Sequence, residues 1–128
     1  MPKPAASFDA VRAIGRDLPD LQESAMYGSP ALRLGKRLVA CLPTHRSAEP
    51  GSLVLRTDFE QRAALLAEDP ETYYVTDHYL SHPLVLVRLA RVTHEQLRAL
   101  VGAARQCILA DAARAQKRTP SRTRGVRQ

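Results

Sequence analysis

The sequence contains no tryptophan, and Phe, Tyr and Trp together make up 5% of its 128 residues. It has no C-x-x-C pair, G-x-S-x-G, Walker loop or H-E-x-x-H motif, so the common signatures of redox, hydrolase, nucleotide and zinc-protease chemistry are missing. No apolar run reaches the ~18 residues of a membrane span. The first ten residues, MPKPAASFDA, lack the apolar core of a secretion signal, which predicts a cytoplasmic protein. We therefore expect no enzymatic activity, cofactor, metal site or membrane partner.

The two cysteines, Cys41 and Cys107, lie in apolar stretches that are far apart in the sequence. Where no export signal is present, disulfides are uncommon and cysteine behaves as a small apolar residue. We therefore expect both thiols to be buried and reduced.

Acidic residues are absent after Asp111, and the segment KRTPSRTRGVRQ that ends the sequence is strongly basic. Without its five basic residues, the 19 Lys and Arg fall to 14 against 13 Asp and Glu, and the net charge falls from +6 to +1. Because this segment has too little apolar content to fold alone, we expect a single domain over residues 1–116 and a flexible tail over residues 117–128. A nucleic-acid-binding arm and a solubilising terminus both fit such a tail. Its basic residues are Lys117, Arg118, Arg122, Arg124 and Arg127.

Three helices are predicted by their first residues and apolar faces. Ser7 fits an N-cap before a face that contains Phe8, Val11 and Ile14, and Pro19 marks the end of that helix. Two further helices begin at capping boxes, in which Thr is followed three residues later by Glu or Gln. These boxes are Thr57 to Glu60 and Thr93 to Gln96, and the second precedes an apolar stripe of Leu97, Leu100, Val101, Ala104 and Ile108.

Short apolar segments over residues 24–27, 31–34, 37–42 and 52–57 predict strands, and the unbroken run 83–92 predicts a central one. The short connections between the first strands favour antiparallel pairing. Together with the helices, they predict a two-layer α+β domain, with helices packed on one face of an antiparallel sheet.

Basic residues gather at the predicted turn of Gly35 and Lys36. Arg33, Lys36 and Arg37 would project there from the sheet, where they could reach phosphates. A solvated turn explains the same charges. Arg88 is different because it interrupts an apolar strand, where a charge requires a partner. Asp20, Glu23 and Asp77 are the candidate carboxylates.

The segment TDHYLSHP concentrates polar side chains that could form a site. His78 and His82 are four residues apart, but the segment precedes Pro83 and follows a β-rich run, so we expect it not to be helical. We also expect no metal here, because no thiolate or further histidine lies nearby in the sequence. The tyrosines of this region fit the rim of a core, or a surface that presents rings to a ligand.

Two blocks of the sequence resemble the MmcQ/YjbR family. They are SAMYGSPALRLGKRLVACL and DPETYYVTDHYLSHPLVLVRLARVTHEQL, and the likeness covers roughly residues 7–110. The resemblance implies a compact α+β fold, related in shape to frataxin-like and secretion-chaperone-like domains, with a DNA-binding label and no catalytic residues. The matching positions are Tyr27, Gly28, Pro30, Lys36, His78, Tyr79 and Arg88.

The sequence departs from that family at two positions. Family members usually carry Trp where Leu84 stands, and many carry a second Trp near Ala104. The simpler interpretation is a smaller, locally repacked core, because Leu84 begins an apolar strand and Ala104 lies on the helix stripe.

Two functions remain open at this point. The first is a nucleic-acid-binding protein, a monomer of low sequence specificity that contacts DNA through Arg33, Lys36, Arg37 and the basic tail. The alternative is an adaptor domain that binds a protein or small ligand in a groove near Tyr27, His78, Tyr79 and Arg88. A continuous basic face would favour the first, and a closed concave pocket the second.

Overall fold

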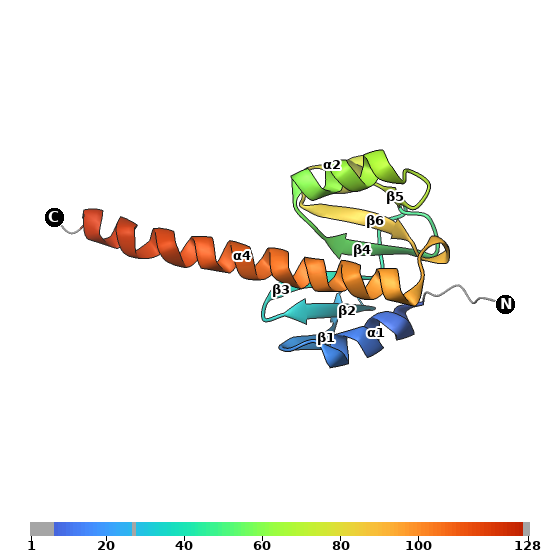
Figure 1. Cartoon of the computed structure of the whole chain (residues 1–128), viewed down its shortest axis with the longest axis horizontal. Coiled ribbons are helices and arrows are strands. Elements are labelled where there is room, and N and C mark those ends of the chain that lie inside the picture. Colours follow the sequence, from blue (N-terminus) through green and yellow to red (C-terminus); the bar gives the residue numbers. More distant parts are fainter. Residues whose placement is uncertain (1–6, 27, 127–128) are drawn as a thin grey trace.

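The computed structural model describes the backbone of residues 7–26 and 28–126 and the side chains of residues 7–25 and 28–116. The described residues form a six-stranded antiparallel sheet with the order β1-β2-β3-β4-β6-β5, accompanied by four α-helices (Figure 1). The strands are β1 (Leu21–Met26), β2 (Ser29–Leu34), β3 (Arg37–Cys41), β4 (Ser52–Arg56), β5 (Tyr73–Tyr74) and β6 (Leu84–Arg88). The α+β class expected from the sequence is confirmed.

The helices are α1 (Phe8–Asp17), α2 (Phe59–Glu68), α3 (Asp77–Leu80) and α4 (His94–Val126), and a 3-10 turn follows β6 at Leu89–Arg91. Side chains of α1 and α4 cover one face of the sheet, and α2 adds Leu65 to the same core beside β5 and β6. The expected layer of helices on one face is therefore present. The short α3 lies on the opposite face, where its Tyr79 is buried.

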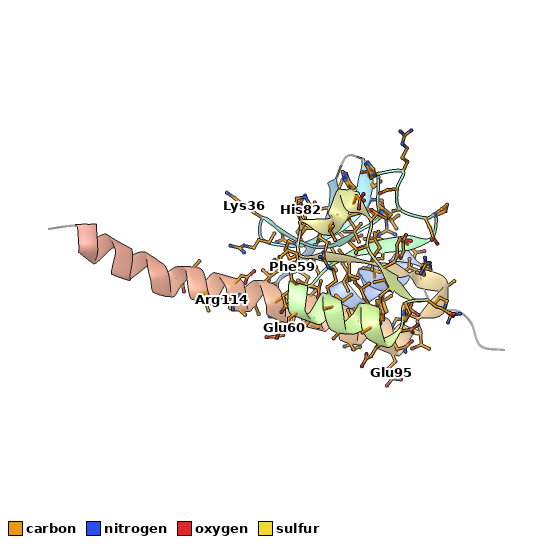
Figure 2. All side chains as sticks on the ribbon, turned by 90° about the horizontal axis from the view of Figure 1, so that it is seen from above. Lys36, Phe59, Glu60, His82, Glu95 and Arg114 are labelled. Atoms are coloured by element: carbon orange, nitrogen blue, oxygen red, sulfur yellow. The ribbon has the colours of Figure 1, made fainter. Side chains whose placement is uncertain are left out.

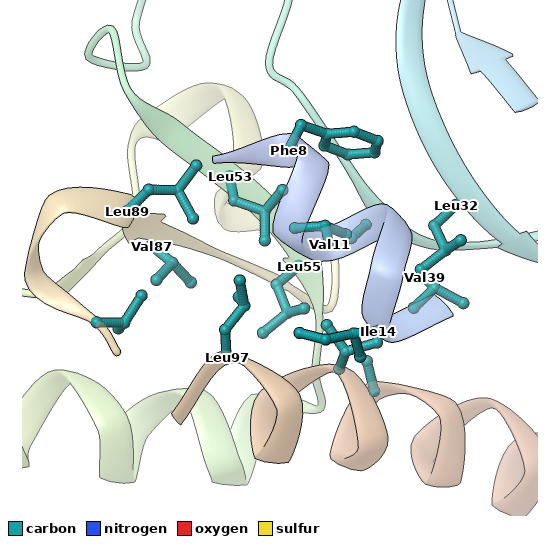
Figure 3. Packing of buried hydrophobic residues seen from close by; sticks show 14 of the residues in the cluster. Phe8, Val11, Ile14, Leu32, Val39, Leu53, Leu55, Val87, Leu89 and Leu97 are labelled. Atoms are coloured by element: carbon teal, nitrogen blue, oxygen red, sulfur yellow. The ribbon is translucent and has the colours of Figure 1, made fainter. Parts of the chain in front are cut away.

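The main core lies between the sheet and the two long helices. Figure 3 shows Val11 of α1 and Leu97 of α4 beside Leu53 and Leu55 of β4, and all four side chains are fully buried or nearly so. This apolar layer drives the assembly, because each such side chain gains roughly 1.5–3 kcal/mol when it leaves water. The predicted apolar faces of α1 and α4 are thus the faces that pack on the sheet.

A close approach of α1 to β2 depends on Gly15. A β-carbon built at this position would lie 2.7 Å from Cδ1 of Leu32, which is buried. Any larger residue would therefore require either the Leu32 side chain or α1 to move.

Two predicted helix starts differ from the structure. Ser7 occupies the N-cap of α1 but makes no side-chain capping bond. At α2 the cap is Asp58, whose carboxylate accepts a 2.7 Å bond from the Gln61 amide, so the box begins one residue later than expected. The predicted box at Thr93 is confirmed, with reciprocal bonds of 2.8 and 3.0 Å to Gln96.

The structure also differs from the expected ends of one strand and from the expected conformation of one loop. The strand expected over residues 83–92 ends at Arg88, and the backbone then turns into the 3-10 segment. The segment TDHYLSHP, expected to be non-helical, contains the one-turn α3 over Asp77–Leu80. Among the residues that the structure describes, none of the helices is apolar over a length that would cross a bilayer.

The last helix continues across the boundary expected at residue 116. Figure 1 shows α4 passing over the sheet and projecting well beyond it, and its backbone is helical to Val126. The projecting end contains Pro120, which has no N–H to donate to the preceding turn. Pro120 therefore leaves this end of the helix with one backbone hydrogen bond fewer than an uninterrupted helix.

Candidate functional site

The basic β2–β3 turn forms as predicted. Gly35 occupies its first central position with a φ of +63°, a conformation that glycine adopts without strain. Lys36 and Arg37 are exposed at the tip. Arg33 is not available in the same way, because its guanidinium donates to Ser24 Oγ at 3.1 Å and to the Lys36 carbonyl at 3.0 Å. Arg33 thus braces the turn, and two of the three predicted contact residues face solvent.

The second basic segment belongs to α4. Positions 114, 117, 118 and 122 are separated by three, one and four residues, a spacing that brings them to one side of a continuous helix. Arg124 lies two residues further along the same helix, and Arg127 lies outside the described residues. Four of the five basic positions predicted for the tail therefore lie on the backbone of the helix that projects from the body.

Both basic segments lie at the same end of the molecule. In Figure 1 the β2–β3 turn lies at the end of the body from which α4 projects, and Figure 2, turned by 90°, shows Lys36 and Arg114 extending at that end.

Most other arginines of the body are already paired. Arg12, Arg91 and Arg98 reach Glu23, Glu71 and Asp17 at 2.6, 2.9 and 3.2 Å. Arg56 on β4 pairs with Asp111 on α4, and Arg114 pairs with the same carboxylate. These ion pairs cancel much of the charge of the body, which agrees with its small net charge.

Arg88 has a partner, but none of the predicted ones. Its guanidinium binds both carboxylate oxygens of Glu49, at 2.9 and 2.7 Å, and donates to the Glu71 carbonyl at 2.9 Å. It also lies 4.2 Å from the centre of the Tyr74 ring. The hydrogen bond from Arg88 lowers the pKa of Glu49 and raises that of Arg88. Glu49 lies in the loop between β3 and β4, 39 residues away, and nothing in the sequence marked it as the partner.

The predicted groove does not assemble as one site. Tyr79 is buried, with 7% of its surface exposed, whereas His78 beside it is exposed. Arg88 lies at the other end of β6, and Tyr27 lies outside the described residues. Of the four residues predicted for the groove, His78 and Tyr79 thus lie together, and Arg88 lies apart from them.

A pocket does form on the face of the sheet that α1 and α4 leave uncovered. It has a volume of about 290 Å³, and its floor comes from neighbouring strands β3, β4 and β6. Its walls come from α3, from the turn that follows α3, and from the residues after β3. The lining residues are Leu38, Cys41, Leu42, Pro43, Thr44, Val54, His78, Tyr79, His82 and Leu84.

The histidines of this region are held by contacts that sequence analysis did not find. The His78 ring stacks on His45, with centroids 3.6 Å apart and planes at 9°, and its other neighbour is the edge of Tyr79. His45 Nδ1 accepts the Ser47 N–H at 3.1 Å, and the Ser47 hydroxyl lies 2.8 Å from that of Thr76. Together these bonds fasten the loop after β3 to α3.

Charge and burial shift the pKa values of two titratable groups near the pocket, His45 and Cys41. Desolvation, together with the positive charges of His78 and Arg46, lowers the pKa of His45. Burial raises the pKa of the Cys41 thiol to about 11, although Arg33 opposes the shift. Both cysteines are free and buried, as predicted. Among the described residues, no three His, Cys, Asp or Glu side chains are grouped to hold a metal.

Arg62 fixes the turn that carries His82. Its guanidinium, buried at 9% exposure, donates to the carbonyls of Leu80, His82 and Leu84 at 3.0, 2.9 and 3.2 Å. The ring of Phe59 lies against the same group, 4.8 Å away. Arg62 precedes Leu65 by three residues, so helical spacing could have placed it on the inward side of α2.

Comparisons with known proteins bear on the fold. No protein-family model matches the chain, and no curated protein is significantly similar to it. Among solved structures, the chain is similar to the crystal structure of the Deinococcus radiodurans protein DR2400, which contains a DUF419 domain. The TM-score is 0.65 with 23% identity, over 84% of this chain and 82% of that one. At this identity the likeness shows a shared fold.

Proposed function

We propose that this protein is a non-catalytic, MmcQ/YjbR-like protein that binds nucleic acid, with duplex DNA as its partner, through phosphate contacts of low sequence specificity. The observation that carries the proposal is the arrangement of its charge. The basic end of α4 projects from the body as a helix, and the tip formed by Lys36 and Arg37 lies at the same end (Figure 2).

Electrostatics support this assignment. Protein–DNA affinity of low specificity comes from cations that neutralise phosphates and release counterions. The body offers few such cations, because many of its arginines already bind carboxylates. The segment 117–128 adds five positive charges with no acidic residue among them. We therefore assign most of the affinity to the end of α4 and a smaller share to the β2–β3 tip.

The shape of the interface fits a helix that reaches along a phosphate backbone. A helix that projects without packing partners is marginally stable in water, and Pro120 weakens it further. Contact with a polyanion would reduce the mutual repulsion of its basic residues. We propose that DNA stabilises this end of the helix as it binds, as the monomer docks on the duplex.

The experiment is a salt titration of duplex binding with four forms of the chain. The first is the intact protein and the second ends after Gln116. The third replaces the tail residues Lys117, Arg118, Arg122, Arg124 and Arg127 by Gln. The fourth is Lys36→Ala with Arg37→Ala. We expect the second and third forms to lose most of the affinity, since each phosphate contact contributes about −0.9 to the slope of log K against log salt. The tip variant should flatten that slope by about one to two.

A matched control is Arg46→Ala with Arg91→Ala, which removes two exposed charges at the end of the sheet opposite to the β2–β3 turn. It should leave the slope nearly unchanged. Equal binding by the intact and truncated chains would move the interface from α4 to the tip. An absence of binding by every form at low salt would overturn the nucleic-acid function itself.

A further inference from the structure

The pocket on the second face of the sheet has the size and lining of a small-molecule site. Its floor consists of apolar side chains, among them Leu38, Val54 and Leu84, which project from three neighbouring strands. Its volume of about 290 Å³ lies at the lower end of the range for ligand pockets, roughly 300–1,000 Å³. The floor therefore suits a compact apolar body and is too small for a folded peptide element.

The polar side chains of the lining carry no negative charge. His78 and His82 present imidazoles at the exposed edge, and Thr44 and Tyr79 add hydroxyl-bearing side chains to the lining. Imidazole and hydroxyl groups both donate and accept hydrogen bonds, and no carboxylate is among the lining residues. An anionic head group therefore finds donors here, whereas a cationic head group finds acceptors but no negative charge to pair with.

The edge of the pocket is also preorganised. The His78 ring is fixed between His45 and Tyr79, and Arg62 holds the backbone on both sides of His82. The Arg46 guanidinium adds positive charge near His45, and its repulsion is one of the causes that lower the pKa of His45. A site whose donors are already positioned loses less free energy when its ligand binds.

We propose that this pocket binds a small monocarboxylic acid with a compact aromatic or branched apolar body. The body lies against Leu38, Val54 and Leu84, and the carboxylate faces the imidazoles of His78 and His82. This site lies apart from the end of α4, because it opens on the opposite face of the sheet, and its lining residue Leu38 directly follows Arg37 of the tip.

The test uses three probes that share one apolar body: 3-phenylpropionate, 3-phenylpropanol and 3-phenylpropylammonium. Each is titrated into the full-length, ¹⁵N-labelled protein and followed by amide shifts. We expect saturable shifts around the pocket, with the acid binding about tenfold more tightly than the alcohol, as for charge-assisted hydrogen bonds. The ammonium probe should bind most weakly.

Two pairs of variants locate the site. Leu84→Trp places an indole in the pocket and should abolish saturable binding of the acid, whereas Leu80→Trp adds the same ring at an exposed neighbour outside the lining and should not. The double variant His78→Gln with His82→Gln should bring the acid and the alcohol to equal affinity while the alcohol still binds. Both histidines are exposed, so this variant remains a test even if Leu84→Trp does not fold.

Three results would overturn the proposal. They are the absence of saturable shifts with the acid, shifts that persist in a folded Leu84→Trp protein, and an ammonium probe that binds as tightly as the acid. DNA binding serves as an independent readout, since the Leu84→Trp and double-histidine variants should bind duplex as the unmodified chain does. Loss of the pocket with retained DNA binding separates this proposal from the preceding one.

Discussion

The two faces of the sheet are covered in different ways, although the same strands supply both. On β4, Leu53 and Leu55 face α1 and α4, and Val54 between them faces the opposite side. The first face is sealed by two helices and a large, continuous set of buried side chains. The second is covered by a loop and the one-turn α3, and a pocket of about 290 Å³ remains there.

This difference separates stability from binding. Helices supply long rows of side chains that fill the space above a sheet to the density of a solid. A loop and one helical turn cannot do so, because fewer side chains point inward and the backbone must keep its own hydrogen bonds. The helix-covered face thus holds the domain together, and the second face retains room for a ligand.

The largest expected effect comes from the same substitution, Leu to Ala, made once on each face of the sheet. Leu97→Ala on the helix-covered face should lower the free energy of unfolding by about 3 kcal/mol, because Leu97 is fully buried. Leu84→Ala should cost about 1 kcal/mol, because Leu84 already lines a pocket. Urea denaturation of both variants measures the difference. Equal losses would show that the second face is as tightly packed as the first.

Arg62→Met tests the clamp beside the pocket. Three carbonyls would lose their donor, and we expect a loss of about 2–3 kcal/mol. The amide signals of residues 80–84 should also move or broaden. The control is Arg16→Met on α1, an exposed arginine whose removal should change stability by ~0.5 kcal/mol or less. A loss no larger than that of the control would show that the turn is held by other contacts.

Arg88→Ala should destabilise the domain by about 2 kcal/mol. The change removes a two-point contact to Glu49, a bond to the Glu71 carbonyl and the contact with the Tyr74 ring. Arg91→Ala provides the comparison, because it removes a single exposed ion pair and should cost ~0.5 kcal/mol. Thermal unfolding of the two variants side by side distinguishes a structural arginine from one available to a ligand.

The free energy of unfolding should decrease at acidic pH, partly because Asp111 becomes protonated. The hydrogen bond and charge of Arg56, with a further contribution from Arg114, hold the pKa of this carboxyl below its ordinary 3.8. A lowered folded-state pKa stabilises the protein above the unfolded-state value, and this contribution is lost as the pH falls through the folded-state pKa. Asp111→Asn should therefore lower stability at neutral pH and flatten its decline below about pH 4. Glu60→Gln, an exposed change on α2, should leave that decline as it is.

The last prediction concerns the rate at which the two cysteine thiols react in the native protein. Cys41 and Cys107 are buried, and burial raises the pKa of each, so both should react slowly with a thiol reagent in the native state. Unfolding in denaturant should release two equivalents. Rapid native labelling of either cysteine without reductant would contradict its buried position.

Local signals in the sequence predicted much of the fold. The apolar faces of α1 and α4, the Thr93 box, the Gly35 turn and the burial of both cysteines all follow from patterns a few residues long. Such patterns act through neighbours in the same helix or turn, so they can be read without knowing the rest of the chain.

The candidate sites were predicted less well, because they depend on distant parts of the chain. The partner of Arg88 proved to be Glu49, and the groove expected around Tyr79 and Arg88 is divided between two ends of β6. Arg62 looks in the sequence like any solvent-exposed arginine on a helix. In the structure it is buried and donates hydrogen bonds to three carbonyls. Long side chains reach whichever partner the fold brings near, and sequence spacing does not record that distance.

The sequence by itself determined most of the helices and strands, the apolar faces of α1 and α4, and the concentration of positive charge after Asp111. Periodicity and composition fix these features, since each follows from residues close together in the chain. The tertiary structure alone decided which face the helices would seal, that His45 would stack on His78, and that α4 would project from the end of the body that carries the Lys36 turn. Those outcomes depend on how the strands pair and how α4 crosses the sheet, because only packing brings residues tens of positions apart into contact.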